Sequence, residues 1–140
     1  MNKSEDFDVV IVGSDINAYY MARNVHEAYG KKVHWIGKVS MPATALSSLG
    51  TVEYVEDLWD KEKFLKVLID YAEAHPNKKL ILIGTNDFYV RNIIENREEL
   101  SKYYLFNYVS EKLFNDLALK DVFYTKYATY DIDFPKTYVF

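Results

Sequence analysis

The strongest constraint on this chain is a run of apolar residues that ends at a glycine close to the first residue. Residues 8–12 read Asp-Val-Val-Ile-Val, and Gly13 follows them. An unbroken β-branched run is typical of a strand that is buried on both faces of a sheet. Ser14 and Asp15 come next, and either can cap a helix. An apolar stripe then recurs at offsets of three and four from Ala18 to Ala28, so the segment predicts the strand, turn and helix that open a βαβ unit.

A second segment repeats this arrangement. Residues 80–83 read Leu-Ile-Leu-Ile and end at Gly84, and Thr85, Asn86 and Asp87 precede a second helical pattern. Strand-end turns in one parallel sheet lie at the same edge, where ligands of open α/β sheets bind. We therefore expect the loops Gly13–Asn17 and Gly84–Tyr89 to face one crevice.

Other segments complete an alternating pattern of strands and helices. We expect strands at 33–36, 52–55 and 104–106, and a long loop with at most one helical turn at 38–50. We expect helices at 60–74 and 87–102, and a third helix that Ser110 caps and that points Leu113, Phe114 and Leu117 inward. A fourth helix is expected to begin with Asp121 as its cap. Strands that alternate with helices predict an α/β fold, a three-layer α/β/α sandwich with a Rossmann-like, mostly parallel sheet. Residues 137–140 resemble the start of a strand, which suggests a chain cut where another domain begins.

Composition excludes several classes of protein. The chain has 140 residues, enough for one domain with a hydrophobic core. Its net charge of −4 without a basic block gives no basis for nucleic-acid binding. It has no cysteine, which excludes disulfides and fits a reducing compartment. Because the first residues lack the apolar core of a signal peptide and no apolar run could span a membrane, we expect a cytoplasmic protein.

Motifs for independent catalysis are missing from the sequence. The three histidines lack ligand-spaced partners for zinc, and neither a G-x-S-x-G elbow nor a Walker A lysine occurs. The first loop has a single glycine, and Asp15 would repel the pyrophosphate of a dinucleotide. Two interpretations of Ser14, Asp15 and Asn17 stay open: they bind a small polar ligand, or Ser14 or Asp15 only caps the helix. The 13 tyrosines likewise fit either the edge of the core or an interface.

A phosphoacceptor receiver domain is an alternative interpretation. Such domains carry acids after the first and third strands, a threonine or serine after the fourth and a lysine after the fifth. In this sequence Asp15, Asp57, Thr85 and Lys112 lie near those positions. The first site offers one acid where a magnesium pocket needs two. The loop at 38–50 also replaces one helix of that fold, so a receiver-like signalling or ligand-binding module remains the second hypothesis.

Two motifs resemble a known family. The stretch 13–23, Gly-Ser-Asp-x-Asn-x-Tyr-x-Met-Ala-Arg, is followed by Glu-Ala-Tyr-Gly at 27–30. Near the other end stand Leu-Lys-Asp-x-Phe-Tyr at 119–124 and Phe-Pro-x-Thr at 134–137. These residues resemble the N-terminal domain of ATP-grasp carboxylate–amine ligases, and in particular D-aspartate ligases of bacterial cell-wall (peptidoglycan) assembly. The resemblance covers essentially the whole chain.

The resemblance implies a pre-ATP-grasp domain at 1–136, with residues 137–140 beginning an ATP-grasp region. Members of the family use ATP and magnesium to activate a carboxylate as an acyl phosphate, which an amine then attacks. Most nucleotide contacts and the metal ligands belong to later domains. The resemblance therefore implies an enzyme only in the full-length protein, with no catalytic or metal-binding residue in this chain and no activity of the chain alone.

The same resemblance implies which residues line the substrate cleft. The implied substrate-binding residues are Gly13, Ser14, Asp15, Asn17, Asn86 and Asp87, and Lys120 is the implied contact to the ATP phosphates. The segment 85–89 has fewer glycines than the family pattern, which leaves its role open. The implied partners are downstream ATP-grasp domains and an amino-acid or peptide substrate. Neither nucleic acid nor a membrane is expected, and a homodimer stays open.

Overall fold

Five parallel strands form the sheet of this protein. They are β1 (Phe7–Val12), β2 (Val33–Gly37), β3 (Gly50–Tyr54), β4 (Lys79–Gly84) and β5 (Tyr104–Leu105), in the order β3-β2-β1-β4-β5. The computed structural model describes residues 7–131, 133, 135 and 138. The chain divides into two units, Met1–Asn107 and Tyr108–Phe140. The whole sheet lies in the first unit.

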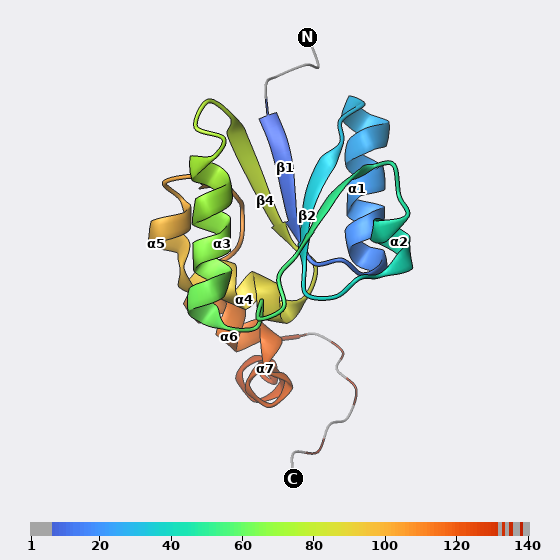
Figure 1. Ribbon diagram of the computed structural model, residues 1–140. Helices are drawn as coiled ribbons and strands as arrows, with labels where there is room; N and C mark the ends of the chain where they lie inside the picture. Colours follow the sequence, from blue (N-terminus) through green and yellow to red (C-terminus); the bar gives the residue numbers. More distant parts are fainter. Residues whose placement is uncertain (1–6, 132, 134, 136–137, 139–140) are drawn as a thin grey trace. The chain divides into compact units, whose positions relative to one another are not determined.

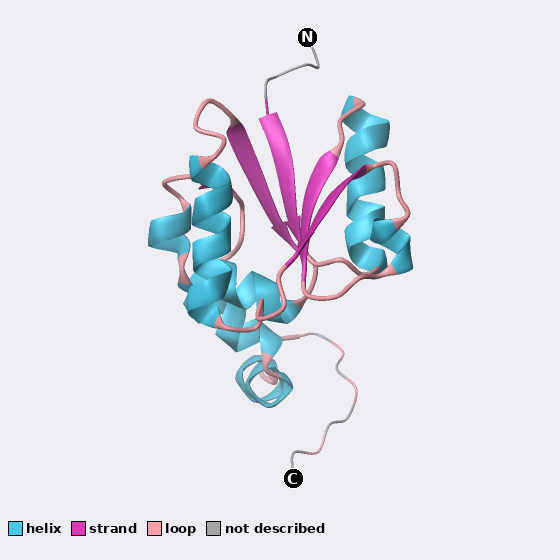
Figure 2. Ribbon diagram, in the orientation of Figure 1, coloured by secondary structure: helices cyan, strands magenta, loops and turns pink. Residues whose placement is uncertain are grey.

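Helices cover both faces of this sheet in the first unit. Figure 1 shows α1 (Ile16–Tyr29) and α2 (Pro42–Ala45) on one side, and α3 (Lys61–Glu73), α4 (Asp87–Glu95) and α5 (Arg97–Leu100) on the other. Figure 2 shows the same three layers, with the strands between two groups of helices. The predicted three-layer, Rossmann-like α/β/α sandwich is confirmed.

The central strand β1 is the centre of the core. Its residues 9–12 are buried, and alternate side chains point to opposite faces of the sheet. On one face, Ala18 and Ala22 let α1 approach the sheet closely, and the Trp35 indole Nε1 donates a hydrogen bond of 3.1 Å to the Ala18 carbonyl. Ala28, which was expected on the buried stripe, is exposed at the last turn of α1.

The strand order excludes the receiver interpretation at the level of topology. Receiver domains have the flavodoxin-like order 2-1-3-4-5, in which the third strand lies beside the first. Here β3 is at the edge and β4 lies beside β1. Asp57 is exposed and pairs with Lys63 at 3.5 Å, so it is not part of an acidic pocket.

Two predicted helices differ from those observed. The helix expected at 87–102 is interrupted at Asn96, whose side-chain amide donates to the Asn92 carbonyl at 2.9 Å and gives the backbone an alternative to a continuous helix. Asp121 was predicted to cap a helix, but Leu119 occupies the cap position and makes no side-chain cap bond. Asp121 is the second helical residue, where its charge still suits the helix dipole.

The second unit contains α6 (Glu111–Ala118) and α7 (Lys120–Tyr127). Ser110 caps α6 as predicted, because its hydroxyl accepts a hydrogen bond from the Leu113 amide. No residue of α6 is buried: Leu113 and Leu117, expected to point inward, are 38% and 45% exposed. The predicted start of a strand at 137–140, and the predicted domain boundary before it, lie outside the described residues except for Tyr138, which is in no helix or strand.

Candidate functional site

The ends of three neighbouring strands are joined by backbone hydrogen bonds. The Gly13 amide donates to the Ile36 carbonyl at 2.8 Å, and the Thr85 amide donates to the Val12 carbonyl at 3.1 Å. These bonds hold the loop after β1 between the loops after β2 and β4. From β1 the chain adds β2 and β3 on one side, and it then crosses back to add β4 and β5 on the other side of β1. The crevice between β1 and β4 is therefore the topological switch point, where open α/β sheets bind ligands. The expectation that the two glycine loops lie at one edge is confirmed.

Gly13 permits the close contact between these loops. Its φ of +131° is a conformation that side chains rarely adopt, and a Cβ atom there would lie 2.0 Å from the Thr85 Oγ1 atom. Thr85 is itself buried, and its hydroxyl has no hydrogen-bond partner among the described residues. Any other residue at position 13 would push the two loops apart.

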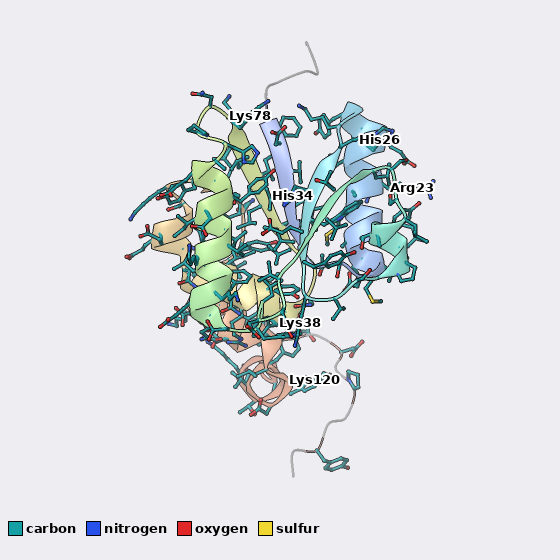
Figure 3. All side chains as sticks on the ribbon, viewed as in Figure 1. Arg23, His26, His34, Lys38, Lys78 and Lys120 are labelled. Carbon is teal, nitrogen blue, oxygen red and sulfur yellow. The ribbon has the colours of Figure 1, made fainter. Side chains whose placement is uncertain are left out.

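A pocket of about 310 Å³ opens at this edge of the sheet, within the usual size range of small-molecule sites. Its lining comes from the loops after β1, β2, β3 and β4 and from the first turn of α4: Gly13, Ser14, Asp15, Lys38, Val39, Met41, Trp59, Asn86 and Tyr89. Figure 3 labels Lys38 at the end of the sheet where the strand arrows of Figure 1 terminate. Four strand-end loops therefore contribute to one pocket.

Two helix caps supply polar atoms to the pocket. Asp15 accepts a hydrogen bond from the Ala18 amide at 3.0 Å through Oδ1, and Asn86 accepts one from the Tyr89 amide at 3.0 Å. The second Asp15 carboxylate oxygen and the Asn86 amide nitrogen make no hydrogen bond among the described residues. Burial, together with the negative charge of Asp15, raises the pKa of the Tyr89 phenol. The caps thus stabilise two helices and leave one acceptor and one donor for a ligand.

Aromatic side chains form one wall of the pocket. The Trp59 ring stacks on Tyr89 with centroids 5.7 Å apart and contacts the Phe88 ring edge-on at 4.3 Å. The Lys38 ammonium lies 5.5 Å from the Trp59 ring centroid, a cation–π distance. Trp59 is 45% exposed although it is part of this ring cluster. A planar or aliphatic portion of a ligand would find an apolar surface here, next to a positive charge.

Ser14 positions a loop. Its hydroxyl donates to the Val39 carbonyl at 2.7 Å, and the Thr44 hydroxyl donates to the Ser14 carbonyl at 2.8 Å. These bonds attach the segment after β2 to the first glycine loop. Ser14 therefore shapes the pocket wall through Val39. Its hydroxyl proton is used in the hydrogen bond to the Val39 carbonyl and is not available to a ligand.

The structure brings some of the expected site residues together. Gly13, Ser14, Asp15 and Asn86 line the pocket, whereas the side chains of Asn17 and Asp87 are exposed and outside its lining. Lys120 is the exposed first residue of α7 in the second unit.

Sequence reasoning missed four lining residues, Lys38, Val39, Met41 and Trp59. Lys38 directly follows Gly37 at the end of β2, so the argument from strand ends applied to it as well. Trp59 comes from the loop after β3 and carried no such signal, because the third strand does not end in a glycine turn.

The described residues contain no cluster of three histidine, cysteine or acidic side chains that could hold a metal ion. Asp15 is the one carboxylate in the pocket lining. The residues of this pocket therefore do not fit a resident magnesium ion. Among the described residues, no helix has both the length and the apolar character needed to cross a membrane.

Fold and pocket together define a Rossmann-like α/β unit with a small-molecule crevice at the switch point of its sheet. No model of a known protein family matches the chain, and no solved structure matches it. The chain is similar to D-aspartate ligase of Enterococcus faecium (strain Aus0004), with 31% identity over 140 residues. The match covers 98% of this chain and 33% of the ligase, so the chain spans about a third of that relative's length. The similarity supports the coarser part of the resemblance seen in the sequence, a relationship to a ligase.

Proposed function

We propose that this chain is the N-terminal domain of an ATP-dependent carboxylate–amine ligase of the ATP-grasp type, and that its pocket forms one wall of the substrate cleft. The observation that carries the proposal is the similarity to a D-aspartate ligase along 98% of the chain. Because about two thirds of that relative lie outside the match, the groups that hold ATP and magnesium are assigned to other domains. The chain alone is proposed to be inactive, and the full-length protein is proposed to act in the cytoplasm on peptidoglycan precursors.

The pocket's chemistry supports an amino acid as the ligand. The free Asp15 oxygen suits an ammonium group, while the Lys38 ammonium and the Asn86 amide nitrogen suit a carboxylate. The Trp59 ring offers an apolar surface for the side chain or for the aliphatic part of an amine acceptor. In this scheme the domain orients a zwitterion so that one of its polar ends faces the rest of the cleft.

ATP and magnesium supply the activation chemistry when bound: the nucleotide transfers a phosphoryl group to a carboxylate, and an amine then displaces phosphate. In the proposed enzyme the one contact from this chain to the nucleotide is Lys120, whose ammonium would offset phosphate charge. Asn17 and Asp87, next to the capping residues, are proposed to contact parts of the substrate outside the pocket.

The test uses the full-length ligase and Asp15→Asn. Asparagine caps a helix as well as aspartate, so α1 keeps its cap while the pocket loses its negative charge. We expect the KM for the amino acid to rise by about 10- to 100-fold, the range for losing a charged hydrogen bond. The measurement is amino-acid-dependent ADP release.

Asp57→Asn is the matched control, because it removes the same charge from an exposed residue outside the pocket. It should leave the KM unchanged. Equal kinetics for Asp15→Asn and wild type would remove Asp15 from the proposed site.

Lys120→Ala tests the nucleotide contact separately. We expect a higher KM for ATP at an unchanged KM for the amino acid. An unchanged KM and kcat for ATP would remove Lys120 from the site and leave the assignment of the pocket intact.

A further inference from the structure

The outer edge of the sheet at β3 carries backbone groups without a partner strand. In the described part of the chain, β3 pairs with β2 on one side and with no strand on the other. Such an edge is a template for another strand unless the protein covers it.

The hydrogen-bond pattern shows which residues face outward. The Val55 amide donates to the Gly37 carbonyl at 2.9 Å, and the Leu49 carbonyl accepts from the Val33 amide at 3.0 Å. In a parallel ladder alternate residues bond to the same neighbour. The odd-numbered residues from Leu49 to Val55 therefore face β2. The amide and carbonyl groups of Val52 and Tyr54 face the free edge.

A groove of about 590 Å³ runs between the end of β3 and one side of α3. The helix contributes a stripe with helical spacing, formed by Lys63, Lys66, Val67 and Asp70. The strand side contributes Glu53, Tyr54, Val55 and Glu56, and Asp60 and Glu62 complete the lining. A strand edge beside a helix is the geometry in which peptides are bound by strand addition.

The charge of the groove selects its partner. Five carboxylates and two lysines line it. Both lysines are already paired, Lys66 with Asp70 at 2.6 Å and Lys63 with Asp57 at 3.5 Å. Neither Glu56 nor Glu62 forms an ion pair among the described residues. The groove therefore has a negative surplus that only a cationic occupant can neutralise.

We propose that this groove binds an extended, lysine- or arginine-rich polypeptide segment, which adds to the sheet as a strand beside β3. The backbone groups of Val52 and Tyr54 supply the ladder bonds, and the acidic side chains Glu56 and Glu62 select the basic partner. The groove is separate from the pocket at the switch point and shares no lining residue with it. This proposal is independent of the ligase function.

The test measures binding of a fluorescein-labelled peptide, Lys-Val-Lys-Val-Lys-Val-Lys, to the 140-residue chain by fluorescence anisotropy. The amide signals of Val52 and Tyr54, followed by NMR, should shift on binding. Two peptides serve as controls: one with glutamate in place of lysine, and one with alternate backbone nitrogens methylated. We expect both to bind at least about 10-fold more weakly, the first through charge and the second through lost ladder bonds.

A double variant, Glu56→Gln with Glu62→Gln, separates this groove from the rest of the acidic surface. It should weaken binding by about 5- to 10-fold, the sum of two exposed charge contacts. The matched control, Glu98→Gln with Asp121→Asn, removes two exposed charges outside the groove and should leave the affinity unchanged.

Three results would overturn the proposal. One is equal binding of the methylated peptide, which would mean attraction by charge without strand addition. Another is an equal loss of affinity in the control variant. The third is a chain that sediments as a dimer and shows no peptide-induced shift at Val52 and Tyr54, which would make a second copy the occupant of the edge.

Discussion

At Gly13 a single hydrogen atom in place of a side chain decides how close two loops can lie. We predict that Gly13→Ala lowers the free energy of unfolding by about 3 kcal/mol, because a Cβ would overlap Thr85 and the backbone at φ +131° becomes strained. Urea unfolding followed by tryptophan fluorescence, to which the buried Trp35 and the half-exposed Trp59 contribute, measures this loss.

Gly30→Ala is the matched control for that prediction. Gly30 has a φ of +68°, but nothing lies within 4 Å of its missing Cβ, so only the left-handed backbone opposes alanine and the loss should be about 1 kcal/mol. Combining Gly13→Ala with Thr85→Ala should restore part of the stability. Equal losses at the two glycines would mean that the contact with Thr85 is unimportant.

The contacts of the His34 imidazole explain a shift of its pKa. Its Nδ1 lies 3.0 Å from the Thr51 hydroxyl and its Nε2 lies 3.4 Å from the Glu53 carboxylate. Its ring stacks on Tyr71, which in turn stacks on His75. Burial lowers the pKa of His34, the Glu53 carboxylate opposes this, and the charge of His75 lowers it further.

The lowered pKa predicts a pH dependence of stability. Between the lowered native pKa and the ordinary value near 6.5, the unfolded chain binds more protons at this residue than the native chain does. The contribution of His34 is therefore complete above about pH 6.5 and is lost as the pH falls.

We predict that His34→Gln loses less stability than wild type between about pH 7.5 and about pH 5.5, as measured by urea unfolding at both values. The comparison with wild type cancels the titration of other groups. His26→Gln, the same substitution at an exposed histidine on α1, is the control, and an equal effect of both substitutions would remove the assignment to His34. A steeper pH dependence in His34→Gln would contradict the lowered pKa.

At the scale of elements, the buried strands were the most predictable features. The runs before Gly13 and Gly84 identified β1 and β4 because a fully buried strand needs an unbroken apolar sequence. Caps were less predictable: Ser110 caps its helix as expected, Asp121 does not, and Asp60 is the cap of a helix that was expected to begin with it. The break at Asn96 could not be read from the sequence, because apolar spacing continues across it and only the amide of Asn96 competes with the helix.

The two caps in the pocket allow helix stability to be separated from ligand binding. We predict that Asp15→Ala and Asn86→Ala each cost about 1 kcal/mol of unfolding free energy, because each leaves a helix amide without its acceptor. Asp15→Asn should cost a few tenths at most, since asparagine caps equally well. Thermal unfolding of the three variants provides the comparison, and a large loss in Asp15→Asn would show that the carboxylate charge itself stabilises the fold.

At the scale of the whole molecule, strand order was what local patterns could not supply. Each βαβ unit is visible in the sequence, but the edge position of β3 depends on which way the chain crosses the sheet after Tyr54. That crossing places β4 beside β1 and so brings Asp15 and Asn86 to one pocket. It also brings Trp59 there from a loop far away in sequence. For this reason Ser14, Asp15 and Asn86 of the polar lining were predicted, whereas Lys38 and the aromatic ring of Trp59 were not.

The division of the chain into two units leads to a prediction about truncation. Among the residues that the structure describes, the sheet ends with β5 at Leu105, and the buried apolar residues of the core all precede Asn107. A chain of residues 1–107 should therefore unfold in one cooperative transition. Circular dichroism and tryptophan fluorescence should give coincident urea curves.

A shorter chain, 1–102, is the control because it lacks β5. It loses the buried Tyr104, whose hydroxyl donates to the Leu68 carbonyl at 2.7 Å on α3, and leaves the β4 edge of the sheet uncovered. Removing a buried aromatic side chain costs about 3–5 kcal/mol, a large part of the stability of a small domain. We therefore expect 1–102 to unfold at much lower urea concentration than 1–107.

If 1–107 itself lost its cooperative transition, the helices α6 and α7 would be required for the sheet to fold, and the two units would form a single folding unit.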